Sequence, residues 1–228
     1  MCFSASASFG AAALIGTAGV VAYKKANTPS TRPFAAIPIL FAIQQFFEGC
    51  LWLSLSQPFA TGSEFWTIFC TYGFLVFAWV IWPFYVPYSL RMMERKTKRK
   101  NILIILLGIG AALSTLLTVV LIRHGVSASI SQNHIAYKIN LTFGFGWLIS
   151  ILYLLSTVFS CFVSSVKKVS IFGVYNLTSF LLIKWFFNEH VISVWCFFAA
   201  VMSILVVMIV YEQEKFSTPS SIQNPDAN

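Results

Sequence analysis

Charge is scarce in this chain. Only 10% of its 228 residues are Asp, Glu, Lys or Arg, whereas an ordinary soluble domain carries about 25%. Acidic residues number 7, and Asp226 is the sole aspartate. The sequence contains no Cys-x-x-Cys and no His-x-x-x-His, the spacings typical of zinc sites. We therefore expect neither a well-solvated soluble surface nor a metal site built on a known motif.

The chain is instead rich in long apolar runs, and 58% of its residues are hydrophobic. Seven runs approach the roughly 20 residues that a helix needs to cross a hydrocarbon core of about 30 Å. In lipid each helix satisfies its own backbone polar groups, so the pattern predicts an all-α, seven-helix membrane bundle. The predicted spans are Phe3–Tyr23, Phe34–Leu55, Phe65–Leu90, Ile102–Ile122, Leu141–Val163, Val169–Phe187 and Val191–Tyr211. We expect one domain at residues 1–211 and a disordered tail at residues 212–228, whose composition is polar.

The third predicted span contains Trp82-Pro83 and then Pro87. Proline removes a backbone donor, so a kink or an early end is predicted near these residues. Trp82 itself fits an interfacial aromatic belt, because tryptophan is enriched where a span meets the headgroups.

The basic residues indicate the orientation of the chain. Twelve of the 15 Lys and Arg fall on one side of the predicted spans: Lys24, Lys25, Arg32, Arg91, Arg95, Lys96, Lys98, Arg99, Lys100, Lys167, Lys168 and Lys215. The positive-inside bias then places the N-terminus outside and the C-terminus in the cytoplasm. The net charge of +8 is explained by this placement, so we expect a lipid bilayer as partner and no nucleic acid. The basic run from Arg91 to Lys100 is either such a topology signal alone or also a site for anionic headgroups.

Two ionisable side chains lie within predicted spans, and such groups are costly in lipid. Glu48 lies in the second span with Gln44 and Gln45, so that all three share one helical face. Lys184 lies in the sixth span, in the outer third of its helix like Glu48. Two alternatives are open for Lys184: an ion pair with Glu48, or extension of its amine to the outer interface.

Four of the five cysteines map to the outer half of the predicted bundle: Cys2, Cys50, Cys70 and Cys196. Three roles are open for them. They can fill space as small apolar side chains, form a disulfide such as Cys2 to Cys196, or bind a metal together with His134, His190 and Glu48. The spacing favours the first role, so no metal ligands are assigned and any cofactor is unknown.

The opening Met1–Ala5 resembles that of an uncharacterised bacterial family of small membrane proteins. The other segments that carry the resemblance are Ala7-Ser8-Phe9, Gln44-Gln45 with Glu48-Gly49 and Trp52-Leu53, Trp82-Pro83, His134-Ile135 with Tyr137, and Ser193–Ala200. It implies a multi-pass protein of the bacterial inner membrane and supplies no activity. Its signature residues map to one depth near the outer face. The predicted ligand-binding set is therefore Cys2, Gln44, Gln45, Glu48, His134, Lys184, Trp195 and Cys196.

Three functions are compatible with this pattern. The first is a small transporter or ligand-binding protein with an outward-facing polar pocket around Glu48. The second is a membrane hydrolase that acts on lipid, with Glu48 as acid or base and His134 or Cys2 as its partner. The third is an accessory structural subunit without chemistry of its own. The sequence favours the first, and it fixes neither enzymatic activity nor the oligomeric state.

Overall fold

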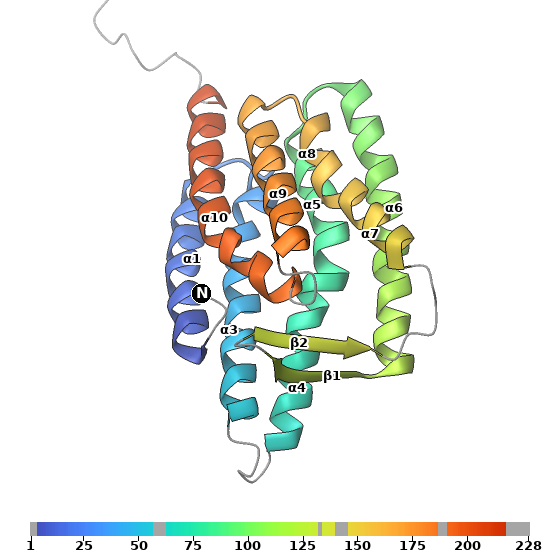
Figure 1. Ribbon diagram of the computed structural model, residues 1–228. Coiled ribbons are helices and arrows are strands. Elements are labelled where there is room, and N and C mark those ends of the chain that lie inside the picture. Colours follow the sequence, from blue (N-terminus) through green and yellow to red (C-terminus); the bar gives the residue numbers. More distant parts are fainter. Residues whose placement is uncertain (1–3, 57–62, 132–133, 140–145, 187–190, 218–228) are drawn as a thin grey trace, which may run out of the picture.

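The computed structural model describes residues 4–56, 63–131, 134–139, 146–186 and 191–217. Over these ranges the chain forms seven long helical segments and one β-hairpin (Figure 1). In chain order the elements are α1 (Ala5–Lys25), α2 (Arg32–Ala35), α3 (Ile37–Ser56), α4 (Ser63–Leu75), η1 (Val76–Ile81), α5 (Trp82–Met93), α6 (Thr97–His124), β1 (Val126–Ser131), β2 (His134–Ile139), α7 (Gly146–Leu154), η2 (Leu155–Phe159), α8 (Ser160–Val163), α9 (Lys167–Phe186) and α10 (Val191–Ser217).

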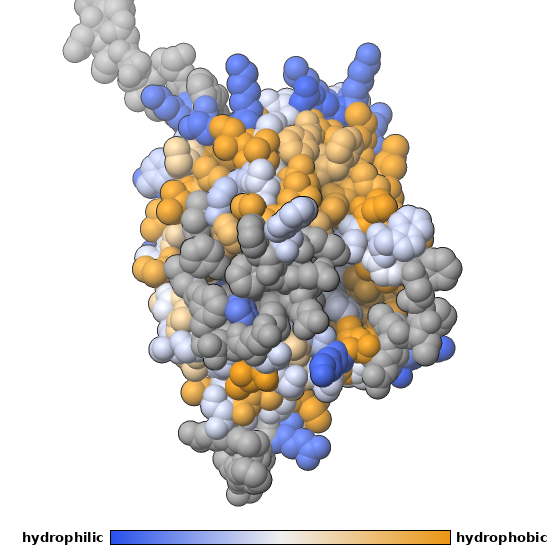
Figure 2. Space-filling view, viewed as in Figure 1, coloured by the Kyte–Doolittle hydropathy of each residue, from blue (hydrophilic) through white to orange (hydrophobic). Residues whose placement is uncertain are grey.

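Over the described residues, each predicted span overlaps one helical segment. Over the described residues, five segments are long and apolar enough to cross a membrane: Ala5–Lys25, Arg32–Ser56, Glu64–Met93, Thr97–His124 and Gly146–Val163. Large apolar side chains are exposed on the sides of the bundle, among them Leu14 at 70% and Ile122 at 76%. Figure 2 shows this apolar surface below a hydrophilic upper end. So much exposed apolar area is unusual for a soluble protein and favours contact with lipid.

Helices α1 and α3 pack closely and antiparallel. A Cβ atom at Gly19 would lie 2.8 Å from the backbone nitrogen of Ile39, and one at Gly49 would lie 2.8 Å from the ring of Phe9. Small residues allow such approach in membrane bundles, where packing rather than the hydrophobic effect holds helices together. The contacts set residues near position 9 of α1 beside residues near position 49 of α3.

The third helical segment is broken by the π-helical turn η1. At its end the N–H of Trp82 donates to the carbonyl of Phe77, five residues back. In the same register the carbonyl of Ala78 would meet the nitrogen of Pro83, which has no hydrogen. The hydroxyl of Tyr153, from α7, donates to this carbonyl at 2.7 Å. The break thus brings together the third and fifth segments.

Helix α6 packs against the same break. Pro87 cannot donate a backbone hydrogen bond to the carbonyl of Pro83. Gly110 lies against this carbonyl so closely that a Cβ atom at position 110 would be 1.9 Å from its oxygen. Ser114, one turn further along α6, donates through Oγ to the carbonyl of Val80 at 2.6 Å. The predicted irregularity near Pro83 is confirmed, and η1 places it just before the proline.

The β1–β2 hairpin is an exception to the all-α fold that the sequence predicts, and it lies in the connection between the fourth and fifth predicted spans. The strands pair antiparallel, with Ile130 opposite Ile135 and Ser131 opposite His134. β1 reads Val-Ser-Ala-Ser-Ile-Ser, a strict alternation of apolar and polar residues that is typical of a strand. Figure 1 shows the hairpin lying across α4 in the lower half of the bundle, between α3 and α6. Ile135 is buried there against Leu51 and other residues of α3 and α4.

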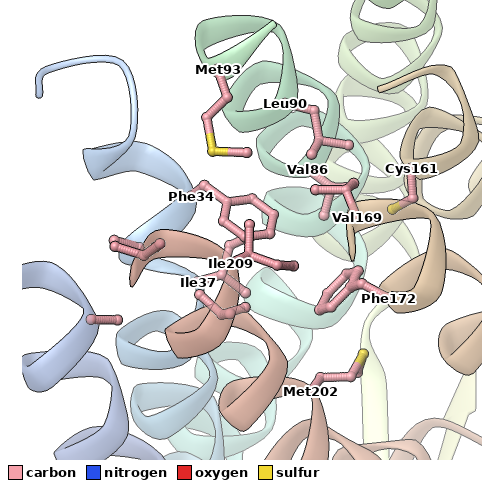
Figure 3. Packing of buried hydrophobic residues seen from close by; sticks show 14 of the residues in the cluster. Phe34, Ile37, Val86, Leu90, Met93, Cys161, Val169, Phe172, Met202 and Ile209 are labelled. Carbon is pink, nitrogen blue, oxygen red and sulfur yellow. The ribbon is translucent and has the colours of Figure 1, made fainter. Parts of the chain in front are cut away.

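The largest apolar core lies toward the opposite, basic end. The rings of Phe34 and Phe172 meet edge to face with centroids 6.0 Å apart. Leu90 and Met93 of α5 and Ile209 of α10 complete this packing (Figure 3). The core joins α2, α5, α9 and α10.

At this end Glu94 joins two connections of the chain. Its buried carboxylate accepts hydrogen bonds from the amides of the two following residues at 3.0 and 2.9 Å, and from the amide and hydroxyl of Ser165 at 2.6 and 2.7 Å. Burial alone would raise the pKa of Glu94, but these hydrogen bonds outweigh it and hold the pKa below its ordinary value. Arg99 in turn donates to the carbonyls of Val163 and Ser164, the end of α8.

Helix α10 extends past the predicted span end at Tyr211 to Ser217. The sequence predicts a disordered tail from residue 212, yet Glu214 accepts hydrogen bonds from the amide and hydroxyl of Thr28 and from the hydroxyl of Thr31. These contacts with the first connection hold the additional turn of helix. The remainder of the predicted tail, residues 218–228, lies outside the described residues.

Candidate functional site

The polar residues predicted on the second span share a buried face of α3. Gln44, Gln45 and Glu48 are 2%, 1% and 0% exposed. The amide Nε2 of Gln45 donates to Oε2 of Glu48 at 2.8 Å. Positions i, i+1 and i+4 of a helix point to one side, so the packed bundle encloses all three side chains together. The structure thus places a carboxylate and two amides inside an otherwise apolar assembly.

Trp82 connects this face to the broken third segment. Its indole Nε1 donates to Oε1 of Gln44 at 2.7 Å, and its ring stacks on Phe41 with centroids 4.0 Å apart. At 5% exposed, Trp82 is an interior residue rather than part of an interfacial belt. In the sequence, the Trp82-Pro83 pair marks the position of the break in the third segment. In the structure, the indole beside this break points into the bundle.

Three buried polar atoms near this face have no hydrogen-bond partner among the described residues: Oγ of Ser8, Oε1 of Gln45 and Nε1 of Trp52. Trp52 lies one turn beyond the carboxylate on α3. Ser8 lies beside the same part of α3, because the next residue, Phe9, packs against Gly49. Buried polar atoms are nearly always satisfied by protein, ordered water or a bound molecule. This region therefore offers both donor and acceptor positions to a small molecule.

His134 lies on β2 and is 6% exposed. Its neighbour Ile135 packs in one cluster with Leu51 and Trp52 of α3. The hairpin therefore carries His134 to the C-terminal part of α3, the helix that holds the polar face. Sequence reasoning assigned His134 to an outer connection and did not recognise the strands that position it.

The other predicted ligand-binding residues are only partly placed. Cys2 lies outside the described residues. Lys184 is on α9, and Trp195 and Cys196 are on α10, but the side chains of these three residues also lie outside the description. The predicted Glu48–Lys184 ion pair and Cys2–Cys196 disulfide stay predictions. Within the described part of the chain, no group of three or more His, Cys, Asp or Glu is placed to hold a metal ion.

Comparison with known proteins agrees with the resemblance seen in the sequence. The model of a family of unknown function, DUF6629, matches residues 1–221. This match covers every helix and strand described above, including the polar face of α3. No curated protein and no solved structure matches the chain. The chain therefore belongs to the DUF6629 family of unknown function.

Proposed function

We propose that this protein spans the membrane and binds a small polar ligand at the Glu48 face, as a small transporter does. The observation that carries this proposal is the complete burial of Glu48 beside Gln44 and Gln45. Burying a charged group costs several kcal/mol, and well-packed apolar side chains usually stabilise a core as well or better. Three buried polar residues at one depth of the bundle are therefore better explained by ligand binding than by a contribution to stability.

The broken third segment supports a role that includes movement. π-helical turns are frequent at functional sites, and transporters place interrupted helices beside their substrate site. Here Trp82 follows η1 directly and donates to Gln44. A change in the break would therefore be transmitted to the polar face through one hydrogen bond.

The buried polar atoms that have no hydrogen-bond partner among the described residues indicate the chemistry of the ligand. Oε1 of Gln45 accepts, Nε1 of Trp52 donates, and the hydroxyl of Ser8 can do both. Together with the carboxylate of Glu48 they suit a compact molecule that carries both donors and acceptors. Amines, amino alcohols and zwitterions belong to this class.

The proposal predicts that water-borne reagents reach this face from the outside. We would compare Gln45→Cys with Phe46→Cys. Position 46 is at the same depth of α3, but its side chain faces away from the bundle, since Phe46 is 52% exposed. A small cationic methanethiosulfonate added outside should modify position 45 at least tenfold faster than position 46, with peptide mass spectrometry separating them from the native cysteines. Equal rates, or labelling of position 45 from the cytoplasmic side alone, would contradict an outward-facing site. Ser8→Cys gives a second reading if Gln45→Cys does not fold.

A further inference from the structure

We propose that Cys50 and Cys70 form a disulfide that links the outer halves of α3 and α4. The two residues lie near the ends that the short connection between Ser56 and Ser63 joins. The proposal is independent of the ligand site, although it shares the outward placement of this end of the bundle.

The register between the two helices sets these cysteines opposite each other. A Cβ atom at Gly73 of α4 would lie 2.5 Å from the ring of Phe47 on α3, so positions 47 and 73 face one another. Because the helices are antiparallel, three residues forward on α3 match three residues back on α4. This brings Cys50 to Cys70, and their thiols interact directly.

The close approach at Gly73, three residues from Cys70, favours the short backbone separation that a disulfide requires. The Cα atoms of a linked pair are usually within about 7 Å, which helices reach only where a small residue lets their backbones come together. Cys50 and Cys70 pack in one cluster with Trp52 and Ile135, which fixes both thiols on the contact between α3, α4 and the hairpin. Both cysteines are free thiols in this structure.

The different exposure of the two thiols assigns their order of reaction. Cys50 is half-buried, whereas Cys70 is 2% exposed. The Cys50 thiolate attacks the disulfide of an oxidant, either a small-molecule disulfide or that of a thiol oxidoreductase, and releases one thiol of the oxidant. The Cys70 thiolate then attacks the sulfur of Cys50 and releases the second. Two electrons and two protons pass from the cysteines to the oxidant, which leaves as two thiols. Outside the cytoplasm such oxidants prevail.

Glutathione disulfide is the probe for this sequence of steps. The reduced full-length protein is incubated with it in detergent, free thiols are blocked, and cysteine peptides are mapped by mass spectrometry. The wild type should give peptides joined through Cys50 and Cys70, while Cys161, fully buried at the other end, is recovered as a blocked thiol. Cys70→Ser should accumulate glutathione on Cys50. Cys50→Ser should leave Cys70 at least tenfold less reactive.

A second readout needs no substitution. Closing the loop between Cys50 and Cys70 by oxidation should raise the melting temperature of the wild type by about 5–10 °C. Oxidation should leave the melting temperature of Cys50→Ser unchanged. A stable glutathione adduct on Cys50 of the wild type, pairing of Cys50 with another cysteine, or no reaction at all would overturn the proposal. None of these outcomes would alter the labelling of Gln45→Cys, so the two proposals fail separately.

Discussion

Replacement of Gly110 by alanine tests the broken third segment directly. The added Cβ would lie 1.9 Å from the carbonyl oxygen of Pro83 and 2.7 Å from its carbon. Both are backbone atoms, so no side-chain rotation can relieve the clash, and α6 must move away from α5 by more than about 1 Å. That movement stretches the 2.6 Å bond between Ser114 and Val80 beyond hydrogen-bond length.

The expected cost combines three effects. Overpacking costs about 1–3 kcal/mol, the lost buried hydrogen bond costs about 1 kcal/mol, and the better helix propensity of alanine returns about 1 kcal/mol. The net loss of about 1–3 kcal/mol corresponds to a melting temperature about 2–12 °C lower for a chain of this size. Thermal unfolding of the purified protein in detergent measures it.

Gly108 provides a matched control two residues away on the same helix. A Cβ atom there meets nothing within 4 Å. Gly108→Ala should therefore keep or raise the melting temperature, because only the helix propensity changes. If Gly110→Ala is as stable as Gly108→Ala, then α6 does not rest on the Pro83 carbonyl and the described break is wrong.

Three further predictions concern the buried polar groups. Trp82→Phe keeps an aromatic ring beside Phe41 but removes the donor to Gln44, and should lower the free energy of unfolding by about 1–2 kcal/mol. An unchanged melting temperature in thermal unfolding would show that the hydrogen bond from Trp82 to Gln44 does not stabilise the fold. Glu94→Gln should cost about 2–4 kcal/mol at neutral pH. Because the folded pKa of Glu94 lies below its ordinary value of 4.5, this stabilisation is present above that pH and is lost as the pH falls through the folded pKa. The difference in the free energy of unfolding between wild type and Glu94→Gln should thus become smaller in acid. A difference that does not change with pH would contradict the lowered pKa of Glu94. In a thermal-shift panel of amines, amino alcohols and zwitterions, a ligand at 100 times its Kd should stabilise the wild type by about 2.7 kcal/mol and Glu48→Gln far less. Equal stabilisation of both would place the ligand elsewhere.

The sequence predicted those features that depend on local patterns. Apolar runs located the seven helical segments, because length and composition alone decide whether a helix can cross lipid. The spacing of Gln44, Gln45 and Glu48 predicted a shared face, which the structure shows as buried. Pro83 predicted an irregular third segment, since a missing N–H acts on its own helix. Whether these polar residues bind a ligand stays a prediction.

Features that depend on contacts between distant residues could not be read in this way. The hydrogen bond from Trp82 to Gln44 spans 38 positions, and the one from Ser165 to Glu94 spans 71. Neither has a local signal in the sequence. The β-hairpin did have one in the alternation of β1, but the long apolar runs on either side dominate any search for helices.

The orientation of the bundle is the claim on which the outward-facing site depends most. Ser129 on the hairpin and Lys98 at the start of α6 are both exposed and lie at opposite ends of α6 in the chain. In intact cells, a membrane-impermeant maleimide should label Ser129→Cys and should label Lys98→Cys only after the membrane is opened. Labelling of Lys98→Cys with protection of Ser129→Cys would reverse the bundle, and equal labelling of both would contradict a membrane-spanning chain.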